Sequence, residues 1–247
     1  MNIAQYLDST YLKTPAQSGL SQEETLQKDI ELTQEAIDHG IFAVMIRPDY
    51  VSEIKKYIQE KNSDVVVGTV IGFHEGTYSV EEKLAEAEKA IADGADELDF
   101  VINYSAYTKG DLELVKNEFV QCTKLCLEHH KIAKWIIEIA ALTDEQIADL
   151  TKNISAWAEE NFSKNDLSKI FVKSSTGFYE TEGGKPNGAT FEGIKIMLEN
   201  AGKLPVKAAG GVRTPEDAEK MISLGVQRIG TSSALALIKN QSASEGY

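Results

Sequence analysis

Two lysines and two aspartates stand in or beside short apolar segments that are typical of buried strands. Lys173 is expected at the end of Ile-Phe-Val-Lys, and Lys207 at the end of a strand that contains Pro-Val-Lys-Ala-Ala. Asp8 follows the first apolar run, and Asp99 interrupts Glu-Leu-Asp-Phe-Val-Ile. Lysine is almost never fully buried without a partner. These four residues are therefore the first candidates for chemistry.

Two buried lysines on neighbouring strands could supply a nucleophilic amine. Each ammonium group disfavours the protonated form of the other, and burial lowers the pKa of lysine further. A lysine that is uncharged near neutral pH attacks carbonyl carbon. Asp8 and Asp99 would offset positive charge and move protons. Two plainer interpretations stay open: both lysines only form ion pairs that close the structure, and Asp8 caps a turn or a helix.

Three loops after the last strands are rich in glycine and hydroxyl residues. Adjacent glycines let a ligand approach the backbone closely, and the N–H groups at the start of a helix, here near residue 234, favour an anion. Each loop alone is typical of an ordinary turn, but together they predict a phosphate site. Its predicted residues are Ser175, Thr176, Gly177, Gly210, Gly211, Gly230, Ser232 and Ser233.

The elements that must position these residues alternate along the chain. Apolar runs without polar alternation are typical of parallel strands that are covered on both faces. Amphipathic segments with serine or threonine near their starts, several of which end at glycine, lie between them. We predict strands at 5–8, 42–46, 64–73, 97–102, 134–139, 169–175, 205–211 and 227–232, and helices at 21–39, 79–93, 111–129, 143–160, 189–200, 215–224 and 234–238.

This repetition predicts an α/β fold, a single (β/α)8 TIM barrel of 247 residues. We expect one domain over residues 1–247 with a short C-terminal tail at about 240–247. No GxGxxG follows the first strand, which argues against a dinucleotide-binding sheet. In a barrel, functional residues gather at the C-terminal ends of the strands. The lysines, aspartates and glycine loops should therefore share one face.

Composition limits the partners. The chain has 25 basic and 39 acidic residues, a net charge of −14, which disfavours nucleic acid and anionic membranes as partners. No apolar run approaches the roughly 20 residues that span a bilayer. The first residues lack the basic and apolar regions of a signal peptide. We expect a cytoplasmic protein with small-molecule partners.

Residues that bind metals are few. None of the four histidines shows an HxH or HExxH spacing, and a catalytic zinc site usually needs two or three histidines or equivalent ligands. We therefore expect no metal and no cofactor. Cys122 and Cys126 lie four residues apart on one expected helix, where a disulfide is geometrically poor. We expect them to be free thiols.

The segments that hold these residues resemble the deoxyribose-phosphate aldolase family. The resemblance implies a class I aldolase that reversibly cleaves 2-deoxy-D-ribose 5-phosphate to D-glyceraldehyde 3-phosphate and acetaldehyde. It also implies a homodimer. The matching segments are Leu-Asp-Ser-Thr at 7–10, Glu-Leu-Asp-Phe-Val-Ile-Asn at 97–103, Val-Lys-Ser-Ser-Thr-Gly-Phe at 172–178, Val-Lys-Ala-Ala-Gly-Gly-Val-Arg-Thr at 206–214 and Arg-Ile-Gly-Thr-Ser-Ser at 228–233.

By the same resemblance, each candidate takes a role. Lys173 is similar to the lysine that forms the Schiff base, and Lys207 to a second lysine that lowers its pKa and assists proton transfer. Asp99 is similar to an acid/base carboxylate that acts through water, and Asp8 to a residue that orients the lysines. Tyr247 is similar to a terminal tyrosine that reaches the site and exchanges a proton at the enamine carbon.

Two positions depart from some members of the family. Phe178 stands where some carry a lysine near the phosphate, so the strength of phosphate dependence stays open. Met45 stands where some carry a cysteine on the second strand. The resemblance therefore implies resistance to inactivation by unsaturated aldehydes.

Three other functions stay open beside this one. Another Schiff-base barrel aldolase or a transaldolase would use the same amine on a different sugar phosphate. A sugar-phosphate isomerase would use Asp8 and Asp99 as acid and base without a covalent intermediate. A non-catalytic barrel would bind a sugar phosphate without turnover. Borohydride separates the covalent functions from the others, because only an imine is reduced to a stable adduct.

Overall fold

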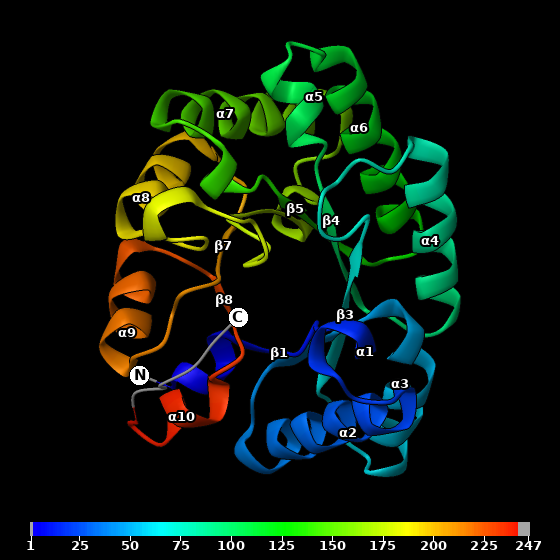
Figure 1. Ribbon diagram of the computed structural model, residues 1–247. Coiled ribbons are helices and arrows are strands. Elements are labelled where there is room, and N and C mark those ends of the chain that lie inside the picture. The colour runs from blue at the N-terminus through cyan, green and yellow to red at the C-terminus, as the bar shows by residue number, and fades with distance from the viewer. Residues whose placement is uncertain (1, 242–247) are drawn as a thin grey trace.

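The computed structural model describes residues 2–241, and its core is a closed barrel of eight parallel strands (Figure 1). The strands follow one another around the barrel in chain order, from β1 to β8, and β8 pairs with β1. The predicted α/β barrel is confirmed. The strands are β1 (Leu7–Thr10), β2 (Ala43–Ile46), β3 (Val66–Ile71), β4 (Glu97–Val101), β5 (Ile132–Ile136), β6 (Ile170–Lys173), β7 (Val206–Ala209) and β8 (Arg228–Thr231).

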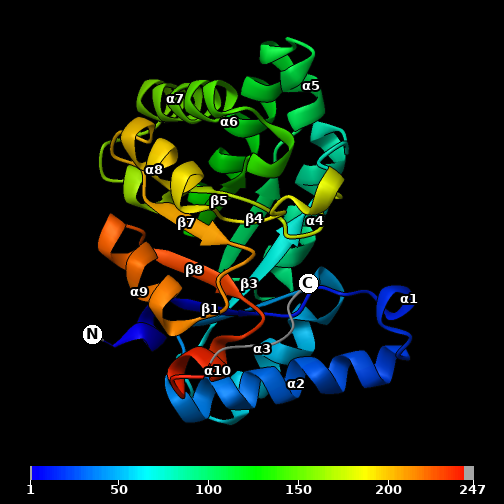
Figure 2. The same cartoon turned by 60° about the vertical axis from the view of Figure 1, so that its left-hand side comes forward.

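Helices surround the strands, as the turned view also shows (Figure 2). Capping boxes begin three of the longer helices, at Ser21, Ser79 and Thr143, because each hydroxyl accepts a backbone N–H three residues on. No helix among residues 2–241 is long and apolar enough to cross a membrane. The α-helices are α1 (Pro15–Ser18), α2 (Gln22–His39), α3 (Val51–Glu60), α4 (Val80–Ala92), α5 (Tyr104–Thr108), α6 (Leu112–Glu128), α7 (Asp144–Asn161), α8 (Phe191–Asn200), α9 (Pro215–Leu224) and α10 (Ala234–Ile238).

Side chains of neighbouring strands separate into two layers. Phe100 of β4 stacks on Trp135 of β5, and Phe119 of α6 covers Trp135 from outside, with centroid distances of 5.0 and 5.3 Å. The preceding residues, Asp99 and Lys134, are also register partners but point into the barrel, since successive side chains alternate between faces. The barrel interior therefore holds charged groups, and the apolar core lies between strands and helices.

Three predicted strand positions were wrong, and two of them move candidate residues. Residues 3–6 form a 3-10 helix, so the first strand begins at Leu7 and Asp8 lies within it. Lys207 is the second residue of β7 and does not end that strand. β5 ends at Ile136, and the chain turns away at Glu138, whose φ is 56°. Apolar runs mark buried segments, but they do not mark where a chain leaves the sheet.

One long helix, α3, was not predicted. Its buried residues Val51, Ile54 and Ile58 have helical spacing, so the pattern was present in the sequence. The expected tail at 240–247 lies almost wholly outside the described residues.

Candidate active site

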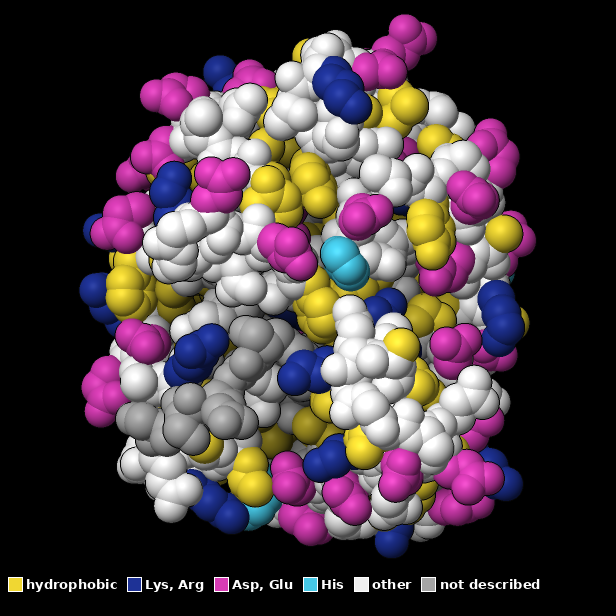
Figure 3. Space-filling model, viewed as in Figure 1, with side chains coloured by type: hydrophobic (Ala, Val, Ile, Leu, Met, Phe, Trp, Pro, Cys, Tyr) yellow, Lys and Arg dark blue, Asp and Glu magenta, His cyan; other side chains and the backbone are white. Residues whose placement is uncertain are grey.

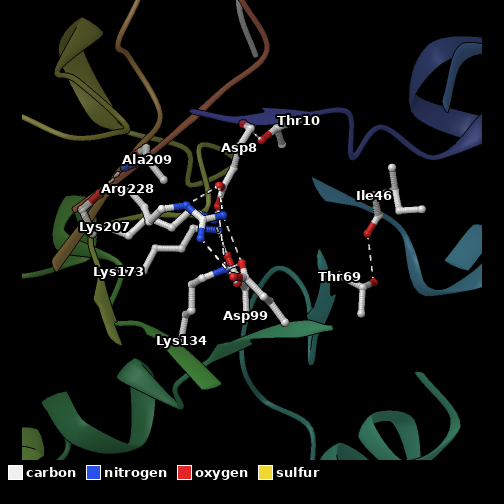
Figure 4. A network of polar contacts seen from close by, with 12 residues as sticks. Asp8, Thr10, Ile46, Thr69, Asp99, Lys134, Lys173, Lys207, Ala209 and Arg228 are labelled. Carbon is white, nitrogen blue, oxygen red and sulfur yellow. Dashed lines mark hydrogen bonds and ion pairs between the residues drawn. The ribbon is translucent and has the colours of Figure 1, made fainter. Parts of the chain in front are cut away.

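Seven charged side chains from six strands meet inside the barrel (Figure 4). All are at least 95% buried. Burial of charge is costly unless each charge has partners, and every member of this set has at least one ion-pair partner within it. The seven residues, called the ion cluster below, are Asp8, Glu97, Asp99, Lys134, Lys173, Lys207 and Arg228.

Asp99 is the acceptor that the lysines share. Its Oδ2 accepts hydrogen bonds from Lys173 Nζ and from Lys207 Nζ, each at 2.8 Å. Its Oδ1 accepts from Lys134 Nζ at 3.1 Å. Burial alone would raise the pKa of Asp99, but the three ammonium groups outweigh burial and hold this pKa well below its usual range. Asp99 is therefore ionised.

Asp8 holds the other side of the ion cluster. Arg228 Nε donates to Asp8 Oδ1 at 2.8 Å, and Lys207 Nζ lies 2.5 Å from Asp8 Oδ2. Arg228 also donates to Glu97 at 3.0 Å, and Lys134 donates to Glu97 as well. Burial opposes ionisation of Asp8, but Arg228 and the lysines outweigh it and lower the pKa. Asp8 thus holds Lys207 from the side opposite Asp99, as an orienting residue would.

The charges of the ion cluster balance when Lys173 is neutral. Three carboxylates then face three cations, because Glu97 completes the acids and Arg228 completes the bases. Burial lowers the pKa of Lys173 to about 8; Asp99 opposes this shift and Lys207 adds to it. About one tenth of Lys173 is then a free amine at pH 7, against less than about a thousandth for an ordinary lysine. The amine is 3% exposed, so it is shielded from bulk solvent.

A small cavity opens at Lys173, which lies in its wall. Seven of the eight predicted phosphate-binding residues also line it, and Gly177, Gly210 and Gly211 do so with φ near +80° that only glycine adopts freely. Ser175 is the exception, since it is fully buried and does not line the cavity. The N–H of Ser233 donates to Thr231 Oγ1 at 3.0 Å, so this helix-start N–H is already engaged.

Two basic side chains, those of Lys173 and Arg213, line this cavity. On the face seen in Figure 3, acidic side chains are frequent at the rim, and several lysine and arginine side chains lie nearer the middle, where acidic ones also occur. Cations inside an acidic protein focus a local field that attracts anions.

Aromatic rings form another part of the mouth. Phe178 contacts Phe73 edge-on at 5.1 Å and stacks on His74 at 5.7 Å. It also packs against an apolar cluster to which Met45 belongs. The ring at 178 is thus held by packing.

Sequence reasoning missed five charged residues at this end of the barrel or inside it: Glu97, Lys134, Glu138, Arg213 and Arg228. Four of them are charges within predicted strands, and that signal was visible in the sequence. Arg213 lay unremarked after the Gly210-Gly211 pair. Tyr247 lies outside the described residues. Among residues 2–241, no group of three or more histidine, cysteine, aspartate or glutamate side chains is placed to hold a metal ion.

A closed parallel barrel with a buried lysine in the wall of an anion-attracting cavity defines an enzyme of the aldolase class. A family described as DeoC/LacD family aldolase matches residues 4–239. Deoxyribose-phosphate aldolase of Thermococcus kodakarensis is 40% identical over 241 residues, which are 96% of each chain. That of Deinococcus radiodurans is 35% identical over 100% of both chains.

The fold is shared with solved structures of the same kind. The tetrameric deoxyribose phosphate aldolase from Aeropyrum pernix superposes with a TM-score of 0.75 at 29% identity, over 96% of this chain and 89% of that chain. The chain belongs to the DeoC/LacD family of aldolases. The resemblance seen in the sequence is thereby confirmed.

Proposed function

We propose that this aldolase reversibly cleaves 2-deoxy-D-ribose 5-phosphate to D-glyceraldehyde 3-phosphate and acetaldehyde, with Lys173 as the covalent nucleophile. The observation that carries the proposal is the charge balance of the ion cluster, which requires one neutral lysine. Burial lowers the pKa of Lys173, whereas the carboxylates around Lys134 raise the pKa of that lysine. Lys173 is also the member of the ion cluster that lines the cavity.

The reaction follows from this geometry. The amine of Lys173 adds to the C1 aldehyde of the open-chain sugar, and loss of water leaves a protonated imine. Asp99 enters the reaction ionised, which is the state that accepts the C3 hydroxyl proton, through water and with Lys207. The C2–C3 bond breaks, and its electron pair moves toward the imine to form an enamine. Protonation at carbon and hydrolysis release acetaldehyde and restore the amine.

The phosphate is proposed to lie in the same cavity. Arg213, Ser232 and the glycines after β6 and β7 line it together with Lys173. A guanidinium binds phosphate through two parallel hydrogen bonds, which a lysine cannot do. Arg213 would therefore supply the cation that Phe178 does not.

Trapping with borohydride tests the covalent step. Incubation with acetaldehyde and borohydride should leave an ethyl group on one lysine, and peptide mapping should place it at Lys173. Lys173→Arg should remain unlabelled and lose turnover by about 1,000-fold or more, whereas Lys195→Arg, at an exposed position on α8, should behave as the parent.

Several outcomes would contradict the proposal. Label on another lysine, or turnover that survives in a well-folded Lys173→Arg variant, overturns the assigned nucleophile. If the protein converts a sugar phosphate but no lysine carries the ethyl group, an isomerase is favoured. Release of a product other than acetaldehyde favours another Schiff-base aldolase or a transaldolase.

We also propose a cytoplasmic homodimer. Cys122 and Cys126 are buried free thiols, which is typical of a reducing compartment. The relative from Aeropyrum pernix is a tetramer. Light scattering after size-exclusion chromatography decides between dimer and tetramer.

A further inference from the structure

Glu138 is a buried acid that no step above uses. It follows β5 at the C-terminal end of the barrel and is 0% exposed. No lysine or arginine among residues 2–241 forms an ion pair with it, and its Oε1 has no hydrogen-bond partner among those residues. Burial of a carboxyl group without a charged partner costs folding free energy. Such a group at the edge of an active site indicates a functional role there.

The backbone at Glu138 is held in an unusual conformation by the strand that carries Lys173. Its φ and ψ are 56° and 67°, a region that residues other than glycine rarely adopt. Ile137 N donates to Lys173 O at 3.0 Å, and Ile139 N donates to Ser174 O at 2.9 Å. The turn at Glu138 is therefore fastened to β6 on both sides. Its side chain is directed at the segment after Lys173.

The carboxylate of Glu138 binds Thr176 twice. Oε2 accepts from the Thr176 hydroxyl at 2.5 Å and from the Thr176 N–H at 3.2 Å. The same hydroxyl oxygen accepts from Phe178 N at 3.0 Å. One side chain thus fixes the turn between Lys173 and Phe178. Thr176 and Gly177, which this turn positions, both line the cavity.

We propose that Glu138 is a positioning residue of the active site, which orients the turn after Lys173 and bears electrostatically on the amine. This inference rests on the proposed function. The groups that bear on Glu138 are Lys173 on β6, the hydroxyls of Ser175 and Thr176 in the next loop, and Tyr104 on α5.

The ionisation of Glu138 fits this position. Burial raises the pKa of Glu138 to about 7, while Thr176 and Lys173 act against the rise. The carboxyl group therefore changes charge in the range where Lys173 loses its proton. When Glu138 is ionised it favours the ammonium form of Lys173. Removing the charge should make the free amine available at lower pH.

Two substitutions separate the effect of the hydrogen bonds between Glu138 and Thr176 from the effect of the negative charge of Glu138. Glu138→Gln keeps an oxygen for Thr176 but cannot ionise. We expect kcat/KM at the pH optimum to stay within about threefold of the parent, and the rising limb of the pH–kcat/KM profile to move down by roughly 0.5 pH unit or more. Glu138→Ala keeps neither, and kcat/KM should fall about 10- to 100-fold with a raised KM for the sugar phosphate.

Thr176→Val tests the contact itself. If Glu138 acts through Thr176, the effects of Glu138→Ala and Thr176→Val should not add in the double variant. Glu199→Gln, at an exposed position near the end of α8, is the matched control and should match the parent in both rate and pH profile.

The proposal is overturned if Glu138→Gln has the parent's pH profile, or if the losses of kcat/KM in Glu138→Ala and Thr176→Val add fully in the double variant. If circular dichroism shows that Glu138→Ala does not fold, the pH profile of Glu138→Gln and the kcat/KM of Thr176→Val still test the proposal. A parent enzyme that turns over 2-deoxy-D-ribose 5-phosphate, with no change in these variants, contradicts the role of Glu138 alone. A parent without that turnover contradicts the proposed function.

Discussion

Lys173 and Lys207 are register partners on β6 and β7, and both donate to the same oxygen of Asp99 at 2.8 Å. The two amines are thus held close together over one carboxylate. A single carboxylate oxygen compensates one positive charge more readily than two. The arrangement favours loss of a proton from the lysine that the cavity exposes, which is Lys173.

Removing the second ammonium group should raise the pKa of Lys173. Lys207→Met takes away a positive charge that favours the free amine, so the rising limb of the pH–kcat/KM profile should move to higher pH. Each unit of pKa reduces the free amine about tenfold at neutral pH. Kinetics across pH 5–10 measure the shift. Lys195→Met, exposed on α8, should leave the profile unchanged; an unmoved limb in Lys207→Met contradicts the assigned role.

Lys134 should contribute to stability. It is 0% exposed and contacts Glu97 and Asp99. Lys134→Met removes one partner of these buried ion pairs, which costs about 3–5 kcal/mol of unfolding free energy. Urea unfolding measures this loss. Lys124→Met removes an exposed lysine and should change stability by no more than about 0.5 kcal/mol; similar values for the two variants would contradict the stabilising role of Lys134.

Arg213 should make the enzyme prefer the phosphorylated sugar over unphosphorylated deoxyribose. Arg213→Ala removes a charged donor from the cavity wall, so KM for the phosphorylated sugar should rise about 10- to 100-fold. Turnover of unphosphorylated deoxyribose should change little. Lys152→Ala, exposed on α7, is the control. Equal losses on both sugars would place the effect of Arg213 outside phosphate binding.

Asp29 should make the stability depend on pH. It is buried on α2 with an Oδ1 that has no partner among residues 2–241, and burial raises its pKa to about 8 from 3.8 in an exposed chain. The folded state therefore holds its proton more tightly, and stability is lost as pH rises from about 4 to about 8. Asp29→Asn cannot ionise, so its unfolding free energy relative to the parent should grow across this window, by up to about 1.4 kcal/mol for each pH unit. Parallel curves for parent and variant would contradict it.

Unsaturated aldehydes should inactivate the enzyme slowly. Met45 is buried beside the mouth, where a thioether does not add to crotonaldehyde as a thiolate would. The two thiols lie buried on α6, and burial raises the pKa of Cys122 to about 12. Activity should survive incubation with crotonaldehyde, and Met45→Cys should lose it. Rapid irreversible loss in the parent refutes this expectation.

The sequence predicted the elements well where a local pattern defined them. Capping residues such as Ser21 and Ser79 mark helix starts, because a hydroxyl satisfies N–H groups in its own turn. Apolar runs mark the strands, and eight of them with helices between them predict the barrel. Lys173, Lys207, Asp8 and Asp99 were also found from their own segments, since charge inside an apolar run is visible in one dimension.

Tertiary structure alone decided which charges meet. Asp8 and Arg228 are 220 residues apart and touch only because β8 closes onto β1. Whether a strand residue points into the barrel depends on register, and a slip of one residue reverses it. A local pattern carries no information about that closure. The sequence therefore determined the segment of the proposed nucleophile, and the closed barrel determined the charges that surround it.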